Sequence, residues 1–187
     1  MTAKVIYSMN VSLDGFINSS GGALDWAEVD EEIHGWFNDS ARNAAADLYG
    51  RRMYELMAAY WPFALDDPDA GAVERDFAQI WNKVPKVVFS RTLESAPYAE
   101  RLLRSDIADE IARLKAEFDG DLGIGGATIA AALIARNLVD EYRMVVHPAV
   151  LGAGTPYFPP GVQLDLRLIE TRPFANGAVL VAYEPRR

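Results

Sequence analysis

Two glycine corners constrain the fold of this chain more than any other feature of its sequence. One is Gly50-Arg51-Arg52-Met53-Tyr54, and the other is Gly123-Ile124-Gly125-Gly126-Ala127-Thr128. Each corner adjoins a short apolar run and opens a segment in which apolar residues recur with helical spacing. Each therefore predicts a strand that turns directly into a helix.

The corners also suit a particular kind of ligand. Glycine at a strand-to-helix junction lets a phosphate group approach the backbone, and the helix N-terminus supplies free N–H groups and a favourable dipole. Two corners, with arginines at one of them, fit a ligand with two separate phosphate groups, such as NADPH with its 2′-phosphate. The net charge of −9 means that such an anion needs a local positive site. The candidates are Arg51, Arg52 and Arg91, and the alternative for each is a solvated surface charge.

Composition limits the class of protein. The 187 residues suffice for one domain with a full core, and half of them are hydrophobic. The acidic balance argues against nucleic acid as the principal partner. Cysteine is absent, and the sequence shows neither a signal peptide nor an apolar run long enough for a membrane span. We therefore expect a cytoplasmic protein without a membrane partner.

The order of the expected elements predicts the fold class. Strand-like runs occupy 4–11, 45–49, 86–90, a short segment ending at Gly125, 142–147, 164–171 and 178–184, and helical periodicity occupies 30–43, 51–60, 106–118 and 128–136. A long connection covers 12–28, and Asn176-Gly177 is a turn signal between the last two strands. This alternation predicts a three-layer αβα fold of the α/β class. Its central sheet should be mostly parallel and end in a C-terminal antiparallel hairpin.

Several common catalytic motifs are missing from the sequence. Gly123-x-Gly125 lies late in the chain and lacks the third glycine of the dinucleotide fingerprint, and no phosphate-loop motif occurs. The two histidines, His34 and His147, form no zinc-protease motif, so no metal site is expected, and His147 is read as structural. A serine-hydrolase motif is also missing. With so few groups for acid, base or nucleophile chemistry, a cofactor that carries its own chemistry is the economical explanation.

Five motifs occur together in an order and spacing that resemble one superfamily. They are 12–17 (SLDGFI), 50–55 (GRRMYE), 87–92 (VVFSRT), 123–127 (GIGGA) and 151–158 (LGAGTPYF). The chain resembles the dihydrofolate reductase-like superfamily. It is more closely similar to the branch that contains the C-terminal reductase domain of the bifunctional riboflavin-biosynthesis deaminase-reductase (RibD). The likeness covers nearly the whole chain, which we interpret as a single domain of this type over residues 1–187.

The resemblance implies an NADPH site. The first corner would bind cofactor phosphates, and the strand that ends in serine and arginine would flank the 2′-phosphate and adenine. The second corner would approach the pyrophosphate and nicotinamide, and the first strand with its following loop would meet the nicotinamide amide. The residues that inherit these roles are, in that order, Gly50, Arg51, Arg52 and Met53; Ser90, Arg91 and Thr92; Gly125, Gly126, Ala127, Thr128 and Ile129; and Met9 and Ile17. The Gly125-Gly126 junction is expected to be strained, with a cis peptide bond.

The chain departs from dihydrofolate reductases where those enzymes recognise pteridine. Asp25-Trp26 replaces a proline-tryptophan pair, and the cluster Asp30-Glu31-Glu32 replaces a single acid. The resemblance predicts an NADPH-dependent reductase that transfers hydride to a small polar heterocycle or sugar, similar to 5-amino-6-(5-phosphoribosylamino)uracil reductase. The alternatives are a non-catalytic NADPH-binding module and a dihydrofolate reductase that acts on a pterin.

Two carboxylates are candidates for orienting substrate or relaying a proton. Asp14, in a Ser-x-Asp-Gly turn typical of the riboflavin branch, comes first, and Asp30 comes second. Asp14 is alternatively an Asx-turn carboxylate that bonds its own loop. The candidates for an apolar substrate wall, or else for ordinary core positions, are Trp26, Phe37, Tyr54 and Met57.

A homodimer is also expected. The riboflavin branch is commonly dimeric, and Tyr157-Phe158 stand in a loop just ahead of Pro159-Pro160. Apolar loop residues of this sort often mark an association surface when they are exposed. The alternative is that both aromatic rings pack beneath the loop.

Overall fold

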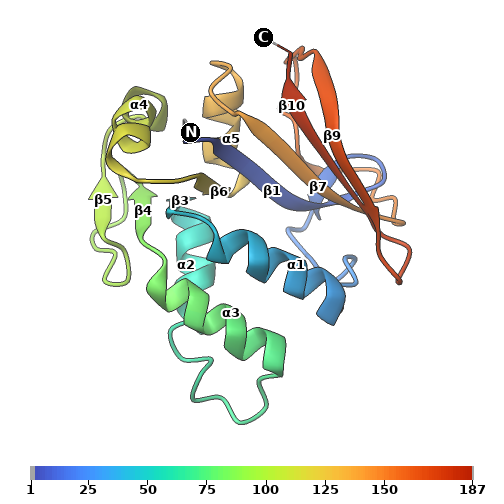
Figure 1. Ribbon diagram of the computed structural model, residues 1–187, viewed down its shortest axis with the longest axis horizontal. Coiled ribbons are helices and arrows are strands. Elements are labelled where there is room, and N and C mark those ends of the chain that lie inside the picture. The colour runs from blue at the N-terminus through green and yellow to red at the C-terminus, as the bar shows by residue number, and fades with distance from the viewer. Residues whose placement is uncertain (1–2, 187) are drawn as a thin grey trace.

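The computed structural model describes residues 3–186 of the chain. Within this range the main sheet has eight strands in the order β5-β4-β3-β6-β1-β7-β10-β9, and β2 pairs with β8 in a separate two-stranded sheet (Figure 1). The strands are β1 Val5–Ser12, β2 Phe16–Ser19, β3 Ala46–Gly50, β4 Lys86–Phe89, β5 Arg101–Leu103, β6 Leu122–Gly125, β7 Glu141–His147, β8 Gly154–Pro156, β9 Leu166–Pro173 and β10 Val179–Pro185.

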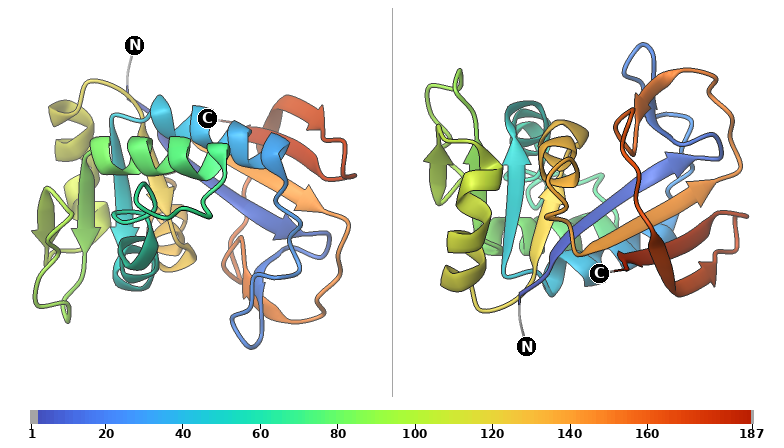
Figure 2. Two further views of the ribbon diagram at one scale, coloured as in Figure 1. Left: turned by 90° about the horizontal axis from the view of Figure 1, so that it is seen from below. Right: turned by 90° about the horizontal axis from the view of Figure 1, so that it is seen from above.

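Helices cover both faces of the main sheet. They are α1 Glu31–Arg42, α2 Arg51–Tyr60, α3 Ala72–Lys83, α4 Ile107–Glu117 and α5 Ala127–Ile134. Helices α1 and α3 lie over one face and α4 and α5 over the other (Figure 2), while α2 begins directly at the end of β3. In sheet order, the six strands β5, β4, β3, β6, β1 and β7 run parallel to one another. Strand β10 pairs antiparallel with β7, and β9 pairs antiparallel with β10. The predicted three-layer α/β fold with a C-terminal antiparallel hairpin is confirmed.

Four elements of the structure were not expected from the sequence. Strands β5 and β8 have three residues each and β2 has four, which is too short for alternation to distinguish a strand from a loop. Strands β2 and β8 pair with each other and so bring the 12–28 connection against the 151–158 loop. Helix α3, the fourth of these elements, buries Ala78, Ile80 and Trp81.

The sheet face toward α4 and α5 carries the larger core. Val5 and Tyr7 of β1, and Leu122 and Ile124 of β6, point to this face and are buried. Successive side chains of a strand point to opposite faces. The residues between these core positions therefore face α1, where they decide the shape of the site.

Tyr157 belongs to this core and not to the surface. Its side chain is 2% exposed, its ring stacks on Tyr7 with 4.4 Å between the ring centroids, and its hydroxyl donates to the Tyr7 carbonyl oxygen over 2.8 Å. Phe158 packs edge-to-face against Tyr157 and is partly buried. The expectation that Tyr157-Phe158 forms an exposed surface is wrong, because both rings pack beneath their loop.

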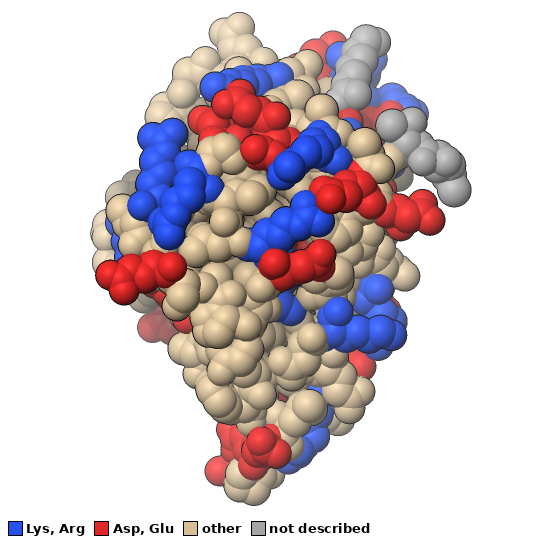
Figure 3. All heavy atoms as spheres, turned by 90° about the vertical axis from the view of Figure 1, so that its left-hand side faces the viewer, with Lys and Arg blue, Asp and Glu red and all other residues tan. Residues whose placement is uncertain are grey.

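The side of the molecule that carries β5 and α4 has a surface of mixed charge. Lys and Arg are intermingled there with Asp and Glu (Figure 3). At the opposite edge of the sheet, β9 leaves Leu168 and Ile169 exposed. Among residues 3–186, no helix combines the length and the apolar character needed to cross a membrane.

Candidate functional site

A pocket lies between α1 and the sheet because several strand residues that face α1 are small. In one row across the sheet, Asp47 of β3 pairs with Gly123 of β6, which pairs with Ile6 of β1. One pleat closer to the carboxyl ends of the strands, Tyr49 pairs with Gly125. Because glycine has no side chain to fill the space beneath the helix, these strands and α1 enclose a cavity of about 560 Å³.

Aromatic and apolar side chains form the pocket wall opposite the sheet. Phe37 comes from α1, Met57 from α2, Trp61 from the end of α2, Phe77 from α3 and Trp26 from the loop before α1. Trp61 and Phe77 pack edge-to-face with 4.5 Å between their ring centroids. Within the described part of the chain, the buried Nε1 of Trp26 has no hydrogen-bond partner, so it is free to donate to a ligand. A wall of this composition suits a flat organic ligand.

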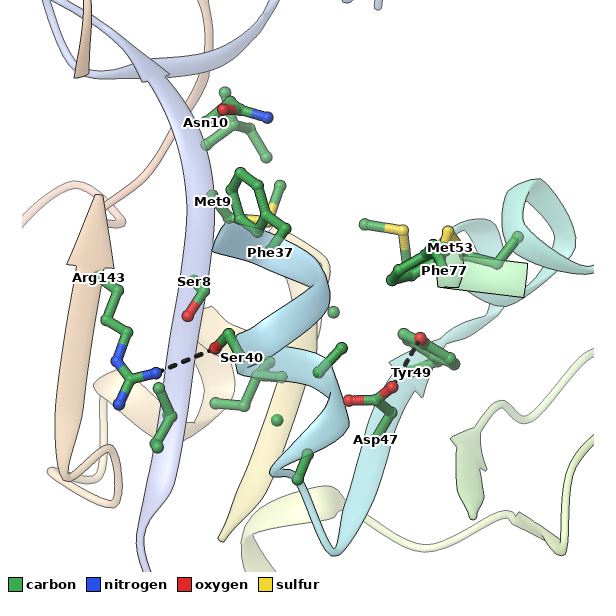
Figure 4. A pocket seen from close by; sticks show the side chains of 18 of the residues that line it. Ser8, Met9, Asn10, Phe37, Ser40, Asp47, Tyr49, Met53, Phe77 and Arg143 are labelled. Carbon is green, nitrogen blue, oxygen red and sulfur yellow. Dashed lines mark hydrogen bonds between the residues drawn. The ribbon is translucent and has the colours of Figure 1, made fainter. Parts of the chain in front are cut away.

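Asp47 places a carboxyl group inside this largely apolar pocket. Its Oδ2 accepts a hydrogen bond from the Tyr49 hydroxyl over 3.1 Å (Figure 4). Its Oδ1 extends over Gly123, where an added Cβ would lie only 2.5 Å away. Burial raises the pKa of the Asp47 carboxyl to about 6, and the nearby Lys86 ammonium opposes part of that shift. Asp47 can therefore change its protonation state near neutral pH.

Arg143 of β7 lines the side of the pocket farther from Asp47. Its Nε donates to Glu141 Oε1 over 2.6 Å, and its Nη1 donates to Ser40 Oγ of α1 over 3.0 Å. The second bond ties α1 to the sheet across the pocket (Figure 4). The guanidinium is thus already engaged by protein groups.

Asn10 of β1 carries an amide into the pocket wall. Its Oδ1 lies 2.9 Å from Nε2 of His147, which is 2% exposed. Burial lowers the pKa of His147, with nearby acidic groups acting in the opposite direction. A buried, neutral His147 that holds Asn10 in place fits the structural role expected for it.

Two helix N-termini adjoin the pocket at the carboxyl ends of β3 and β6. After β3 the chain enters α2, whose Tyr54 packs on the α1 side of the sheet, whereas after β6 it enters α5 on the α4 side. Open α/β sheets bind ligands where neighbouring strands send their connections to opposite faces. The N-caps Gly50 and Gly126 supply no side-chain hydrogen bond. An added Cβ on Gly50 would lie 3.1 Å from Ile129 Cγ2, so the two helix starts lie against each other.

The Gly125-Gly126 peptide bond is trans, and Gly126 adopts a backbone conformation that favours glycine. No cis peptide occurs among the described residues, so the expected cis bond is wrong. Gly126 has a φ of +105°, which side-chain-bearing residues rarely adopt, and an added Cβ would lie 3.3 Å from Met53 Cβ. A Cβ on Gly125 would lie 2.4 Å from the Tyr49 ring. The junction therefore lies close to Met53 of α2 and Tyr49 of β3, and the N-terminus of α5 has no side-chain cap.

The residues expected to bind the 2′-phosphate belong to the start of α2 and the loop after β4. Arg51 and Thr92 line one shallow hollow, which Glu55 and Glu94 also line. Arg51 makes only a long contact to Glu55, at 3.4 Å, between side chains that are both 45% exposed. The Ser90 hydroxyl accepts hydrogen bonds from the backbone N–H groups of Thr92 and Leu93, so it orders the loop.

The remaining expected cofactor residues lie around the pocket and the helix ends. Met9, Ile17, Met53 and Gly125 line the pocket. Strand β1 pairs with β6 only as far as Tyr7 but with β7 as far as Ser12. At Met9, the edge of β1 that faces β6 therefore has no described strand beside it. Such an unpaired backbone edge is what a nicotinamide amide would need to bind. Arg52 is exposed at the start of α2, Arg91 is exposed after β4, and Ala127, Thr128 and Ile129 form the first turn of α5.

Neither expected catalytic carboxylate lines the pocket. Asp14 accepts hydrogen bonds from the Ser12 hydroxyl at 2.7 Å, the Gly152 N–H at 2.7 Å and the Leu151 N–H at 3.1 Å. These bonds, with that of Ser12 the strongest influence, lower the pKa of Asp14. Asp14 thus fastens its turn to the loop after β7, a structural role that differs from the expected Asx turn because the backbone donors belong to a distant loop. Asp30 caps α1 by accepting from the Ile33 N–H over 2.9 Å.

The expected substrate wall is present in part. Trp26, Phe37 and Met57 line the pocket, whereas Tyr54 is buried in the core, where its hydroxyl accepts from the Tyr98 N–H over 3.1 Å. Asp47, Tyr49 and the other polar strand residues of the pocket were missed from the sequence; they are Ser8, Asn10 and Arg143. The signal for Asp47 was a charged residue inside a short buried strand, a position that carboxylates rarely occupy.

A metal centre finds no support in the part of the chain that the structure describes. No group of three or more His, Cys, Asp or Glu side chains comes together there in an arrangement that could hold an ion.

Known proteins share this fold and this sequence pattern. The RibD C-terminal domain family matches residues 3–180. The Bacillus subtilis (strain 168) protein YyaP is 33% identical over 182 residues, which cover 96% of this chain and 94% of YyaP.

Two solved structures are similar in fold. The Thermotoga maritima diaminohydroxyphosphoribosylaminopyrimidine deaminase/5-amino-6-(5-phosphoribosylamino)uracil reductase matches with a TM-score of 0.67 and 16% identity over 99% of this chain and 57% of its own. Dihydrofolate reductase from Enterococcus faecalis, complexed with NADP(H), matches with a TM-score of 0.67 and 15% identity over 100% of this chain and 99% of its own. With its dihydrofolate reductase-like fold and a match over nearly its full length, the chain belongs to the RibD C-terminal domain family.

Proposed function

We propose that this protein is an NADPH-dependent reductase that transfers hydride to a small polar molecule bound beneath α1. The observation that carries the proposal is the position of the pocket. It opens beside two helix N-termini that have no side-chain caps, at the point where β3 and β6 send their connections to opposite faces of the sheet.

The residues present fit a dinucleotide phosphate. The backbone N–H groups that follow Gly50 and Gly126 are available for phosphate oxygens, and neither glycine has a side chain in the way. Arg51 and Thr92 at their shallow hollow, with Ser90 and Arg91 nearby in sequence, would hold the 2′-phosphate. Arginine and hydroxyl donors suit this group because charge-assisted hydrogen bonds to phosphate are strong.

The nicotinamide end would reach the pocket near Met9, Ile17 and Gly125. When bound, reduced nicotinamide supplies the hydride. The protein contributes position, because holding donor and acceptor at near-attack distance is worth roughly 7–11 kcal/mol of the barrier. The aromatic wall around Trp26 and Phe37 would exclude water from the acceptor.

Cofactor binding and turnover test the proposal separately. Calorimetry of the purified protein with NADPH and NADH should show tighter binding of NADPH. Consumption of NADPH should then depend on an added acceptor from a panel of pterins, pyrimidines and aldehydes. NADPH binding without acceptor-dependent oxidation would favour a non-catalytic NADPH-binding module, and absence of NADPH binding would refute the proposal. Turnover confined to dihydropterins would instead identify a dihydrofolate reductase.

A further inference from the structure

The carboxyl group of Asp47 has a position that the proposed cofactor site does not explain. It lies in the row of Gly123, and the Gly125 row is two residues closer to the helix N-termini. Two residues along a strand correspond to about 7 Å. A nicotinamide at the level of Gly125 would therefore leave room for one flat ring between itself and the Asp47 carboxyl.

The surroundings of Asp47 orient this group toward the centre of the pocket. The Tyr49 hydroxyl holds Oδ2, and the missing side chain of Gly123 leaves Oδ1 lying over the β6 backbone. Lys86, next to Asp47 on β4, turns its ammonium away to donate to the carbonyl oxygens of Trp81 and Val84. Asp47 is thus held as a hydrogen-bonded carboxyl group without a direct ion pair to Lys86.

The charged side chains around the pocket limit the charge of a ligand that binds beside Asp47. Among the described lining residues, Arg143 is the one Lys or Arg, and Glu141 and Ser40 already engage it. The charged or titratable side chains that lie nearest the pocket are Asp47, Tyr49, Lys86, Asp121, His34, Glu141 and Arg143. A phosphate or carboxylate deep in this pocket would face the Asp47 carboxyl group, and among the described lining residues it would meet no cation but Arg143, whose Nε and Nη1 already bond Glu141 and Ser40. An uncharged ligand is therefore favoured.

We propose that Asp47 donates the proton in the reduction of an uncharged, planar substrate that carries a C=N bond, with the nitrogen of that bond beside Oδ1 of Asp47. This assignment rests on the proposed reductase function. The substrate carbon gains the hydride that reduced nicotinamide supplies, and the nitrogen gains the Asp47 proton. The C=N double bond becomes a C–N single bond, and the Asp47 carboxylate recovers its proton from water.

The chemistry of the carboxyl group favours nitrogen over oxygen as the proton acceptor. An acid that titrates near neutral pH is matched to an imine-type nitrogen, because a carbonyl oxygen is far less basic. Burial keeps Asp47 partly protonated near neutral pH, since it raises the pKa of this carboxyl to about 6. Tyr49 is a positioning residue: it touches Asp47 and fixes the direction in which the second oxygen points.

Quinazoline is a suitable probe, because it is uncharged, planar and bicyclic, and hydride adds at C4 of its N3=C4 bond, the more electrophilic of its two C=N bonds. Asp47→Asn keeps the shape of the side chain and its ability to accept from Tyr49, but removes the proton. It should lower quinazoline reduction by about 10²–10⁴-fold while NADPH affinity stays unchanged. The control Asp39→Asn makes the same chemical change on an exposed residue of α1 and should leave both measurements unchanged.

A spectroscopic measurement tests Asp47 without turnover. In protein labelled with ¹³C at the aspartate carboxyls, one signal should titrate near pH 6 and be missing from Asp47→Asn. Quinazoline should move this titration to higher pH, because a neutral nitrogen acceptor stabilises the protonated acid. Tyr49→Phe should also move it upward, since the lost hydrogen bond stabilises the charged form.

The outcomes separate this proposal from the proposed function. An Asp47→Asn variant with wild-type quinazoline turnover would overturn the role of Asp47. The substrate class is refuted if the protein binds NADPH but not quinazoline. It is also refuted if quinazoline-2-carboxylate binds as tightly as quinazoline; in both cases the reductase proposal stands. If the protein fails to bind NADPH, the proposed function itself is refuted, whereas the ¹³C titration still reports on Asp47.

Discussion

The hydroxyl of Tyr49 donates a hydrogen bond to Oδ2 of Asp47, two residues earlier on the same strand, over 3.1 Å. Both side chains point toward α1 because residues two apart share a face of the sheet. The opposite strand offers only Gly123 and Gly125 at these levels. The two side chains lie over these glycines, since an added Cβ would lie 2.5 Å from Asp47 Oδ1 at Gly123 and 2.4 Å from the Tyr49 ring at Gly125. This polar pair supports several predictions.

Replacing Asp47 with Asn should stabilise the protein above pH 6. Burial raises the pKa of this carboxyl from 3.8 to about 6, so the folded state binds the proton more tightly than the unfolded state. The stability that this proton contributes is complete below pH 3.8 and is lost as the pH rises through about 6. The shift corresponds to up to about 3 kcal/mol.

Urea unfolding of wild type and Asp47→Asn across this pH range is the measurement. The variant should gain stability relative to wild type as the pH rises. His147 gives the opposite slope, because burial lowers its pKa and its contribution is lost as the pH falls below 6.5, but it is common to both proteins. A constant difference at all pH values would contradict the burial of a charged Asp47.

Arg91→Ala should weaken NADPH binding much more than NADH binding. A charge-assisted hydrogen bond contributes about 1.5–3 kcal/mol, which is roughly 10- to 150-fold in affinity. Calorimetry with both cofactors measures this ratio. Arg113→Ala is a matched control, since Arg113 is an exposed residue of α4 that pairs with Glu110 in its own helix. Equal losses for the two cofactors would remove Arg91 from the 2′-phosphate site.

Gly126→Ala should abolish NADPH binding in a chain that still folds. The substitution places a Cβ at a φ of +105°, 3.3 Å from Met53 Cβ, at the helix end proposed to meet phosphate. The backbone cost is about 1–3 kcal/mol. Gly161→Ala also places a side chain at a positive φ, +81°, with open space around it and away from the pocket. Circular dichroism and cofactor titration of both variants separate strain from lost binding; normal binding by Gly126→Ala would refute the close approach.

Asp14→Asn should lower thermal stability and leave turnover unchanged. Three hydrogen bonds, led by that from Ser12, lower the pKa of this carboxyl, so its contribution is present above the unfolded pKa of 3.8 and is lost as the pH falls below it. The melting temperature near neutral pH should fall, and the difference from wild type should shrink in acid. A loss of turnover by 10²–10⁴-fold with unchanged stability would restore the original expectation of a proton-relaying Asp14.

We further propose that the protein forms a homodimer, now through the β9 edge. Leu168 is 50% exposed and Ile169 is 39% exposed on a long strand whose outer edge is unpaired by any described strand. Such an edge is a template for pairing with another chain. Light scattering over a range of concentrations should show a dimer that Leu168→Lys dissociates, whereas Arg113→Lys on α4 should not. A monomer at every concentration would exclude the dimer.

Local pattern determined most of the secondary structure of this protein. Helix α2 occupies Arg51–Tyr60 as its periodicity predicts, and the β1, β3, β4, β6 and β7 strands lie within a residue or two of their expected bounds. The two glycine corners predicted strand-to-helix junctions, where Gly126 needs its positive φ of +105° and Gly50 leaves little room for a side chain beside Ile129. These features depend on neighbouring residues, which the sequence displays directly.

Tertiary structure decided the pocket and the roles of its carboxylates. Asp47, Gly123, Ile6 and Arg143 come from four strands, and only sheet order and register place them around one cavity beneath α1. The turn sequence around Asp14 predicts a catalytic carboxylate, yet long-range bonds from the loop after β7 occupy its oxygens. A carboxylate acquires its chemistry from burial and partners, and distant parts of the chain supply both.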